Sequence, residues 1–140
     1  MADLVLLDDA IHAVLAAAEP LPAEDVALDE ARGRVLAAAA RATTDLPPFD
    51  SSAMDGFAIR STDAPGRLAI AGRVAAGRPE SRRIAAGEAF EISTGGVVPA
   101  GADAVVPIER VHLDTDTVAI PEGVTSGDNI RARGRDVSAG

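Results

Sequence analysis

The spacing of apolar residues changes near residue 48, and this change constrains the fold more than any other feature of the sequence. Before it, apolar side chains recur at helical spacing, as in Leu7, Ile11, Val14, Leu15 and Ala18. After it, short apolar runs are separated by glycine and proline, a pattern typical of β-strands and turns. The sequence therefore predicts an α+β fold, in which an N-terminal helical segment precedes a β-rich domain of short strands.

Residues 1–47 are predicted to form the helical segment of a first domain. Asp8 is expected to cap the start of one helix, and Pro20 forces its end. Asp29 is the expected N-cap of a second, short helix, and Gly33 suits a left-handed residue at its end. An extended run is expected to follow that glycine.

Residues 48–130 are predicted to form the β-rich domain. Its expected strands lie in five apolar runs: FAIR, RLAIAGRV, EAFEIS, ADAVVPIE and DTVAIP. Pro107 lies inside the fourth run and cannot donate an amide hydrogen to a sheet ladder, so this run is expected at an edge or a bulge. Residues 131–140 are polar and glycine-rich, and are interpreted as a connector.

Charge and composition exclude several classes of partner. The 13 basic and 22 acidic residues give a net charge of −9, whereas a nucleic-acid-binding domain is usually positively charged. The same negative charge disfavours binding to an anionic membrane surface. The chain has no cysteine, so disulfides and thiolate metal sites are excluded. No apolar run approaches the roughly 20 residues of a membrane span, and no signal-peptide pattern opens the sequence. We expect a cytoplasmic protein without nucleic-acid or membrane partners.

The stretch PPFDSSAMDGFAIR places a carboxylate on a tight turn. Asp55 precedes glycine in a strong turn pair, with the oxygens of Asp50, Ser51 and Ser52 close by in the sequence. Such oxygens could hold Mg²⁺ through water or orient an oxyanion. The structural interpretation is a plain turn anchored to the core by its apolar neighbours Met54 and Phe57, and on the residues alone this interpretation is favoured.

Two further stretches have both a functional and a structural interpretation. In ISTGG, Thr94 and two glycines leave a strand with bare amides, which could form an anion-binding nest or an ordinary loop. In NIRARGRD, alternation in an extended segment would place Arg131, Arg133 and Arg135 on one side. That side could bind an anion, or could be a solvated edge.

Taken together and in order, these stretches resemble a known family. DLPPFDSSAMDGFAIRSTD, ISTGGVVPAGADAVVPIE and DNIRARGRDVSAG resemble signature segments of the molybdopterin molybdenumtransferase family, known as MoeA in bacteria and as the E domain of gephyrin in animals. LDDAIHAVL and VALDEARGRVLAA resemble its opening segments, so the resemblance covers nearly the whole chain. It implies a MoeA N-terminal-region-like fold, with an inserted β-rich domain at 48–130 and a return to the first domain at 131–140.

The resemblance also implies an activity and an assembly. The family inserts molybdate into adenylated molybdopterin, releasing AMP in a Mg²⁺-dependent reaction, and its members are elongated homodimers. Their active-site cleft lies between the β-rich domain of one subunit and the pterin-binding domain of the other. The chain resembles only the N-terminal part, so it is expected to supply one wall of that cleft and to be inactive alone. The alternative is a non-catalytic dimerisation or scaffold module, a role that gephyrin illustrates.

Motif matching carries the family's functional positions onto this chain. The resemblance implies catalytic roles for Asp55, Thr94 and Asp136. The groups expected to bind the substrates are Ser52, Gly95, Arg131 and Arg133, and no metal ligand is assigned. If Asp55 is a cleft residue, its side chain should be accessible and close to Thr94.

Three positions depart from the family's usual residues. Phe57 stands where tyrosine is frequent, so a hydroxyl is missing. Gly96 stands where alanine is common, a change of small consequence. Arg135 stands where an acid is common, which reverses a charge beside Asp136.

Overall fold

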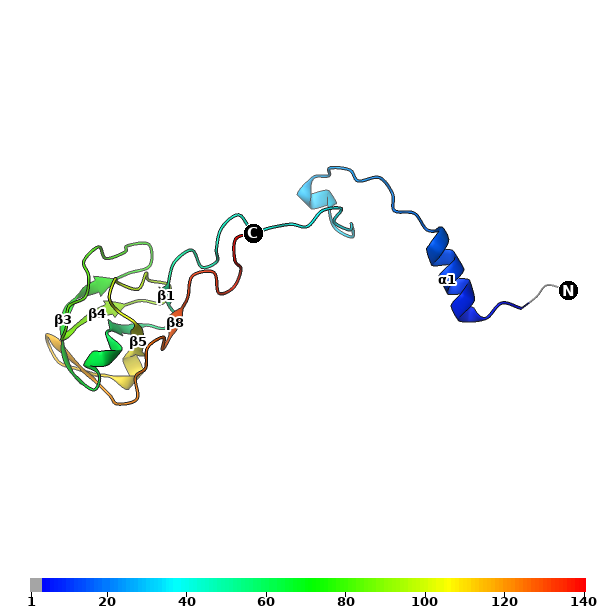
Figure 1. The fold of residues 1–140 in the computed structure, drawn as a ribbon. Coiled ribbons are helices and arrows are strands. Elements are labelled where there is room, and N and C mark those ends of the chain that lie inside the picture. The colour runs from blue at the N-terminus through cyan, green and yellow to red at the C-terminus, as the bar shows by residue number, and fades with distance from the viewer. Residues whose placement is uncertain (1–3) are drawn as a thin grey trace. The chain divides into compact units, whose positions relative to one another are not determined.

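The computed structural model describes residues 4–140, and the chain divides into two compact units, Met1–Ala40 and Arg41–Gly140. The first unit contains helix α1 (Leu7–Ala17) and a single 3₁₀ turn, η1 (Leu28–Glu30) (Figure 1). The first predicted helix is confirmed, and the second is reduced to η1. Both predicted caps are wrong. Leu6 and Ala27 occupy the N-cap positions without side-chain hydrogen bonds, while Asp8 and Asp29 lie in the first turns, where their charges favour the helix dipole.

The apolar stripe of α1 stays exposed within the first unit. No residue of the helix is buried, and its large apolar side chains Leu7, Ile11, Val14 and Leu15 are exposed. An isolated helix of this length is marginal in water, because helix stability in proteins comes mainly from packing an apolar face. The apolar residues of α1 are therefore spaced as in a helix that packs on a core, but they are not buried in a core within the first unit.

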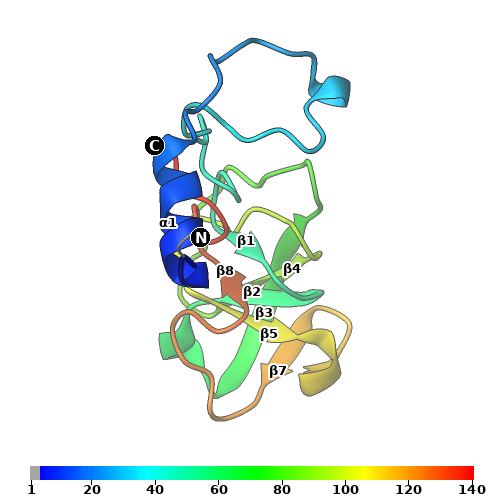
Figure 2. The same cartoon turned by 90° about the vertical axis from the view of Figure 1, so that its right-hand side faces the viewer.

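The second unit is built on a six-stranded sheet with the strand order β5-β2-β4-β3-β7-β6 (Figures 1 and 2). Its strands are β2 (Gly56–Ile59), β3 (Gly66–Val74), β4 (Glu88–Ile92), β5 (Ala104–Pro107), β6 (His112–Leu113) and β7 (Thr117–Ile120). The β3–β4 pair is parallel, and the other neighbouring strands are antiparallel. All five predicted runs form strands, and β5, which contains Pro107, lies at an edge of the sheet as predicted. The 3₁₀ turns η2 (Ser61–Asp63) and η3 (Ile108–Arg110) follow β2 and β5.

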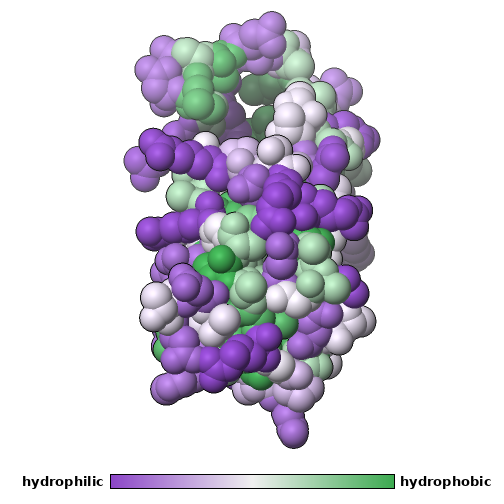
Figure 3. Space-filling view, turned by 90° about the vertical axis from the view of Figure 1, so that its left-hand side faces the viewer, coloured by the Kyte–Doolittle hydropathy of each residue, from purple (hydrophilic) through white to green (hydrophobic). Residues whose placement is uncertain are grey.

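The inner strand β2 is buried on both faces. Because successive side chains of a strand point to opposite faces, Phe57 and Ile59 join one apolar cluster and Ala58 joins the other. Phe57 and Phe90 are the largest fully buried side chains of the core. Phe57 thus anchors the segment as predicted, but Met54 is 40% exposed and does not, so that part of the interpretation is wrong. On the face drawn in Figure 3, hydrophobic side chains lie between hydrophilic ones.

The end of the chain runs back along the start of the second unit (Figure 1). A short two-stranded sheet pairs β1 (Ser51–Ser52) with β8 (Ile130–Arg131). Beyond it, the Leu46 amide donates to the Val137 carbonyl at 2.8 Å, and the Gly140 amide donates to the Ala42 carbonyl at 3.0 Å. Residues 131–140 therefore run antiparallel to residues 42–50 within the second unit. The predicted domain boundaries at residues 47 and 130 stay a prediction.

Asp45 fastens this returning segment. Its Oδ1 accepts the Ala139 amide at 2.9 Å, and its Oδ2 accepts the Arg133 Nε at 2.6 Å. The Ala139 amide, and then the Arg133 guanidinium, hold the pKa of Asp45 below its ordinary value of 3.8. The carboxylate therefore stabilises the return fully above pH 3.8, and the stabilisation is lost as the pH falls below that value.

Replacing Asp45 with alanine is expected to loosen residues 133–139. Losing the two charge-assisted hydrogen bonds should speed amide exchange of Ala139 at neutral pH by roughly fivefold or more, measured by NMR. Amides of β2 should keep their exchange rates. In the unchanged chain, the Ala139 amide shift should move only below pH 3.8. Equal exchange in both proteins would contradict the role given to Asp45.

Candidate functional site

The turn 53–55, between β1 and β2, is where the three unusual stretches of the sequence meet. β1 pairs with β8, so Ser51 lies opposite Arg131, and Ser51 also forms an isolated bridge with Val97. The Ser52 amide donates to the Gly96 carbonyl at 2.9 Å. The Ala53 amide donates to the Asn129 carbonyl at 2.9 Å. Segments from the fifties, the nineties and the region around residue 130 therefore converge on one turn.

Asp55 and Thr94 face each other at this turn. The Asp55 Oδ1 accepts two hydrogen bonds from Thr94, from the backbone amide at 2.7 Å and from Oγ1 at 3.1 Å. Both residues are exposed. The predicted proximity and accessibility are confirmed, while the catalytic roles stay a prediction. Two donors on one oxygen fix the direction of the carboxylate, and its second oxygen has no protein hydrogen bond within residues 4–140.

The turn is held by its own neighbours. Ser52 is only 1% exposed, and its Oγ donates to the Met54 carbonyl at 2.5 Å while the Met54 amide lies 3.2 Å from the same oxygen. The Ile108 amide donates to the Asp55 carbonyl at 3.0 Å. Ser52, a predicted substrate-binding residue, thus has its hydroxyl engaged inside the turn, where it supports the backbone that carries Asp55.

The ISTGG loop is not an open anion nest. The Thr94 amide donates to Asp55, the Gly95 amide to the Ser52 carbonyl at 2.8 Å, and the Gly96 amide to the Ser93 carbonyl at 2.8 Å. The prediction of bare amides is therefore wrong. Gly95 has a φ of +78°, which suits glycine at the third position of the turn that the Gly96–Ser93 hydrogen bond closes. The anion that this loop holds is the carboxylate of Asp55.

The arginines of NIRARGRD do not lie on one extended segment. The segment is extended at β8 and then turns, with Gly134 at a φ of +71°. Arg131 forms an ion pair with Asp136, and the Arg133 side chain bonds Asp45. The expected alternation is wrong because the turn interrupts the extended run. Asp136, the third predicted catalytic residue, is thus engaged by Arg131, and no hydrogen bond or ion pair within the described residues joins it to Asp55.

The described residues do not form a metal site of their own. Within residues 4–140, no group of three histidine, aspartate or glutamate side chains is placed to hold a metal ion. Mg²⁺ takes six oxygen ligands and often keeps several waters, so Asp55 could give it at most one or two. None of the helices among residues 4–140 is long and apolar enough to cross a membrane.

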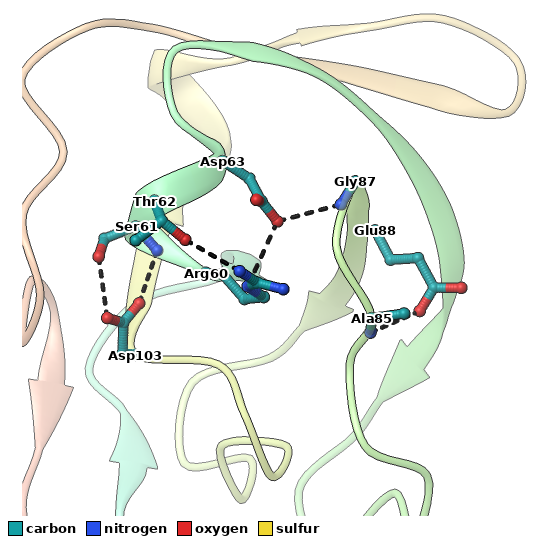
Figure 4. Close-up of polar contacts among 8 residues, drawn as sticks. All are labelled: Arg60, Ser61, Thr62, Asp63, Ala85, Gly87, Glu88 and Asp103. Carbon is teal, nitrogen blue, oxygen red and sulfur yellow. Dashed lines mark hydrogen bonds and ion pairs between the residues drawn. The ribbon is translucent and has the colours of Figure 1, made fainter.

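A second polar cluster lies around η2, and none of its hydrogen bonds or ion pairs involves Asp55 or Thr94 (Figure 4). The carboxylate of Asp103 accepts the Ser61 amide at 2.6 Å and the Ser61 Oγ at 2.8 Å. Asp63 accepts the Gly87 amide at 3.0 Å and pairs with Arg60. Burial raises the pKa of Asp103, but the hydrogen bonds from Ser61, together with those from Ser126 and the Asp103 backbone, leave the pKa below its ordinary value. Both carboxylates bind backbone amides, so this cluster holds loops together.

Removing the Asp103 carboxylate is expected to destabilise the second unit. Asp103→Ala leaves the Ser61 amide and hydroxyl half-buried without their acceptor, at a cost of about 1–3 kcal/mol in the free energy of unfolding. Urea denaturation with an unchanged m-value would report it. Asp114→Ala is the matched control, because Asp114 forms only an exposed pair with Arg67 and a loss of about 0–0.5 kcal/mol is expected. Equal losses in the two variants would contradict this account.

Two residues at the turn were not predicted from the sequence. Ile108 contributes only its backbone amide, which no residue pattern reveals. Asn129 has a φ of +53°. The sequence does indicate a turn at Asn129, because asparagine tolerates the left-handed region and here follows Gly127 and Asp128 in a turn-rich stretch.

Known proteins resemble this chain over most of its length. Residues 5–140 match the family model described as the MoeA N-terminal region (domain I and II). The chain is 41% identical over 122 residues to molybdopterin molybdenumtransferase 2 of Mycobacterium tuberculosis, which covers 82% of the chain and 30% of that relative. It is 34% identical over 139 residues to the molybdopterin molybdenumtransferase of Staphylococcus aureus, covering 94% of the chain and 33% of the relative.

Solved structures agree with the sequence comparison. The crystal structure of the molybdopterin biosynthesis moeA protein from Pyrococcus horikoshii OT3 matches with a TM-score of 0.78 and 38% identity, over 84% of this chain and 33% of that one. A second structure of a moeA protein from the same species matches 99% of this chain with a TM-score of 0.75 and 31% identity. The chain spans about a third of the length of the relatives it matches.

Proposed function

Because this chain belongs to the MoeA N-terminal region family, we propose that it supplies one wall of the active site of a molybdopterin molybdenumtransferase. The proposed reaction is the insertion of molybdate into adenylated molybdopterin with release of AMP. Its relatives carry the name molybdopterin molybdenumtransferase. The individual steps, molybdate insertion and AMP release, are inferred from the resemblance of the three stretches to that family. The observation that carries the proposal is the exposed Asp55–Thr94 pair at the point where these stretches converge.

The chemistry of the pair limits what Asp55 can do. Molybdate and the phosphates of the pterin nucleotide are anions, so a bare carboxylate repels them. The oxygen of Asp55 that Thr94 leaves open can instead accept a hydrogen bond or a proton from a hydroxyl or water beside the substrates. The role of Thr94 is to fix the direction of that acceptor. A Mg²⁺ ion in the reaction would draw most of its ligands from groups outside residues 4–140.

Much of the positive charge that the substrates need is also expected from groups outside this chain. Arg131 and Arg133 are each paired with an aspartate, and the chain has a net charge of −9. Following the family resemblance, we place the pterin- and nucleotide-binding groups on a separate domain, in a homodimer whose cleft lies between subunits. Isolated, this chain is expected to release no AMP from adenylated molybdopterin in the presence of molybdate and Mg²⁺.

A chimera tests the proposal. In it, this chain replaces the matching N-terminal segment of molybdopterin molybdenumtransferase 2 from Mycobacterium tuberculosis, to which it is 41% identical. The folded chimera should release AMP in step with molybdenum insertion, at a rate within about tenfold of the unmodified enzyme, since small misplacements of a wall can change rates by that much. A chimera that folds and dimerises but releases no AMP would sink the catalytic proposal and favour a scaffold module.

A further inference from the structure

Asn129 has an unusual backbone conformation beside the proposed site. Among residues 4–140 it is the one non-glycine residue with a positive φ, at +53°. The left-handed region costs most residues about 1 kcal/mol or more, and asparagine less. Residues in such conformations persist where their surroundings require them, and they gather at functional sites.

The contacts of Asn129 explain why the conformation is kept. Its Nδ2 donates to the Val105 carbonyl at 2.8 Å, and its backbone carbonyl accepts the Ala53 amide at 2.9 Å. The Val105 amide in turn donates to the carbonyl of Asp128, the preceding residue, at 2.9 Å. Val105 is therefore bound on both its donor and its acceptor. The side-chain amide of Asn129 supplies the hydrogen bond that the backbone of a neighbouring strand would otherwise give to Val105 in β5, the buried strand at the edge of the sheet.

These bonds tie both ends of the Asp55 turn to the same strand. At the start of the turn, Ala53 is bound by Asn129, which is bound to Val105 in β5. At its end, the Asp55 carbonyl is bound by the amide of Ile108, the first residue after β5. Strand β5 thus fixes the position of the turn at both of its ends. This restricts where the Asp55 carboxylate can lie and keeps it within hydrogen-bonding distance of Thr94.

We propose that Asn129 is a positioning residue for Asp55. Only asparagine combines the needed properties at this point. Glycine accepts the positive φ but has no donor for Val105, and aspartate has the right size but presents a second acceptor to the Val105 carbonyl. Glutamine and alanine meet the φ less well. The expected effect of Asn129 on catalysis rests on the proposed function. The expected effect of Asn129 on the position of the Asp55 turn does not.

The structural consequence is tested by NMR on the full 140-residue chain. Asn129→Gly and Asn129→Asp should each speed exchange of the Thr94 amide by about fivefold, the equivalent of one lost hydrogen bond, with the larger change in the aspartate variant. Thr125→Ala is the matched control, because it removes a hydroxyl bond to Asp128 in the same loop without touching the turn. Thermal unfolding verifies that every variant is folded. Unchanged Thr94 exchange in both folded Asn129 variants overturns the proposal.

The catalytic consequence is tested in the chimera. Both Asn129 variants should lower kcat by about ten- to a hundredfold, as expected when a reacting group is displaced, while KM for adenylated molybdopterin changes less than twofold. Thr125→Ala should keep the parent kcat. An unchanged kcat in the Asn129 variants, or a loss confined to KM, overturns the catalytic part. An inactive parent chimera counts against the proposed function instead, and the NMR result then decides the role of Asn129 by itself.

Discussion

Replacing Asp55 with asparagine is expected to reduce molybdenum insertion by the chimera by about a hundredfold or more, while the protein stays folded. Asparagine keeps an Oδ1 that can accept both hydrogen bonds from Thr94, so the turn should survive. What it removes is the negative charge and the proton-accepting ability of the open oxygen. The loss should therefore appear in kcat, measured by AMP release, with a melting temperature within about 2 °C of the parent.

Asp114→Asn is the control for this experiment. It removes the same charge from an exposed carboxylate that pairs with Arg67 and lies outside the converging stretches. Its kcat should equal that of the parent chimera. If Asp55→Asn retains full activity, or if both variants lose activity equally, Asp55 has no special part in the reaction and its turn is only structural.

Replacing Gly56 with alanine is expected to unfold much of the second unit. A Cβ on this residue would stand 2.1 Å from the Val106 carbonyl oxygen and 2.9 Å from the Pro107 Cα. Both obstacles are backbone atoms of β5, the hydrogen-bonded neighbour of β2, so no side-chain rotation can relieve the clash. We expect a loss of at least about 3 kcal/mol in the free energy of unfolding, measured by urea denaturation.

Gly77→Ala separates this packing effect from the general effect of losing a glycine. Gly77 has a φ of +76°, and a Cβ there would meet no atom within 4 Å. The variant should lose only the conformational cost of the left-handed region, about 1–2 kcal/mol. A Gly56 variant as stable as the Gly77 variant would show that the two strands can move apart, contrary to the rigid support proposed for Asp55.

Much of the β-rich unit could be predicted because its strands depend on local sequence. Each of the five runs combines apolar residues with a nearby turn residue, and the edge position of β5 is one of the two outcomes, edge or bulge, that Pro107 predicts. The first unit was less predictable. Acidic residues at Asp8 and Asp29 suit both a cap and a first turn, so the sequence could not decide between them.

The sequence predicted which residues belong to the site, but not which hydrogen bonds and ion pairs they form. Asp55 and Thr94 were singled out, and their proximity is confirmed. Of the two interpretations of ISTGG, the nest is wrong because the Thr94 and Gly95 amides are satisfied by Asp55 and Ser52, about 40 residues away, and the Gly96 amide by nearby Ser93. The three arginines were misplaced because the turn at Gly134 breaks their alternation. The long-range hydrogen bonds of Thr94 and Gly95 leave no local pattern in the sequence.

A double-mutant cycle tests the central claim most directly, namely that Asp55 and Thr94 act as one unit of a molybdenum-insertion site. The kcat/KM of the chimera would be measured for the parent, Asp55→Asn, Thr94→Val and the double variant. Thr94→Val removes the Oγ1 bond and keeps the backbone amide bond. If the pair acts as a unit, the double variant should lose no more than about threefold beyond the worse single variant. A double loss equal to the product of two large single losses would show that the residues act independently, and would contradict the site described above.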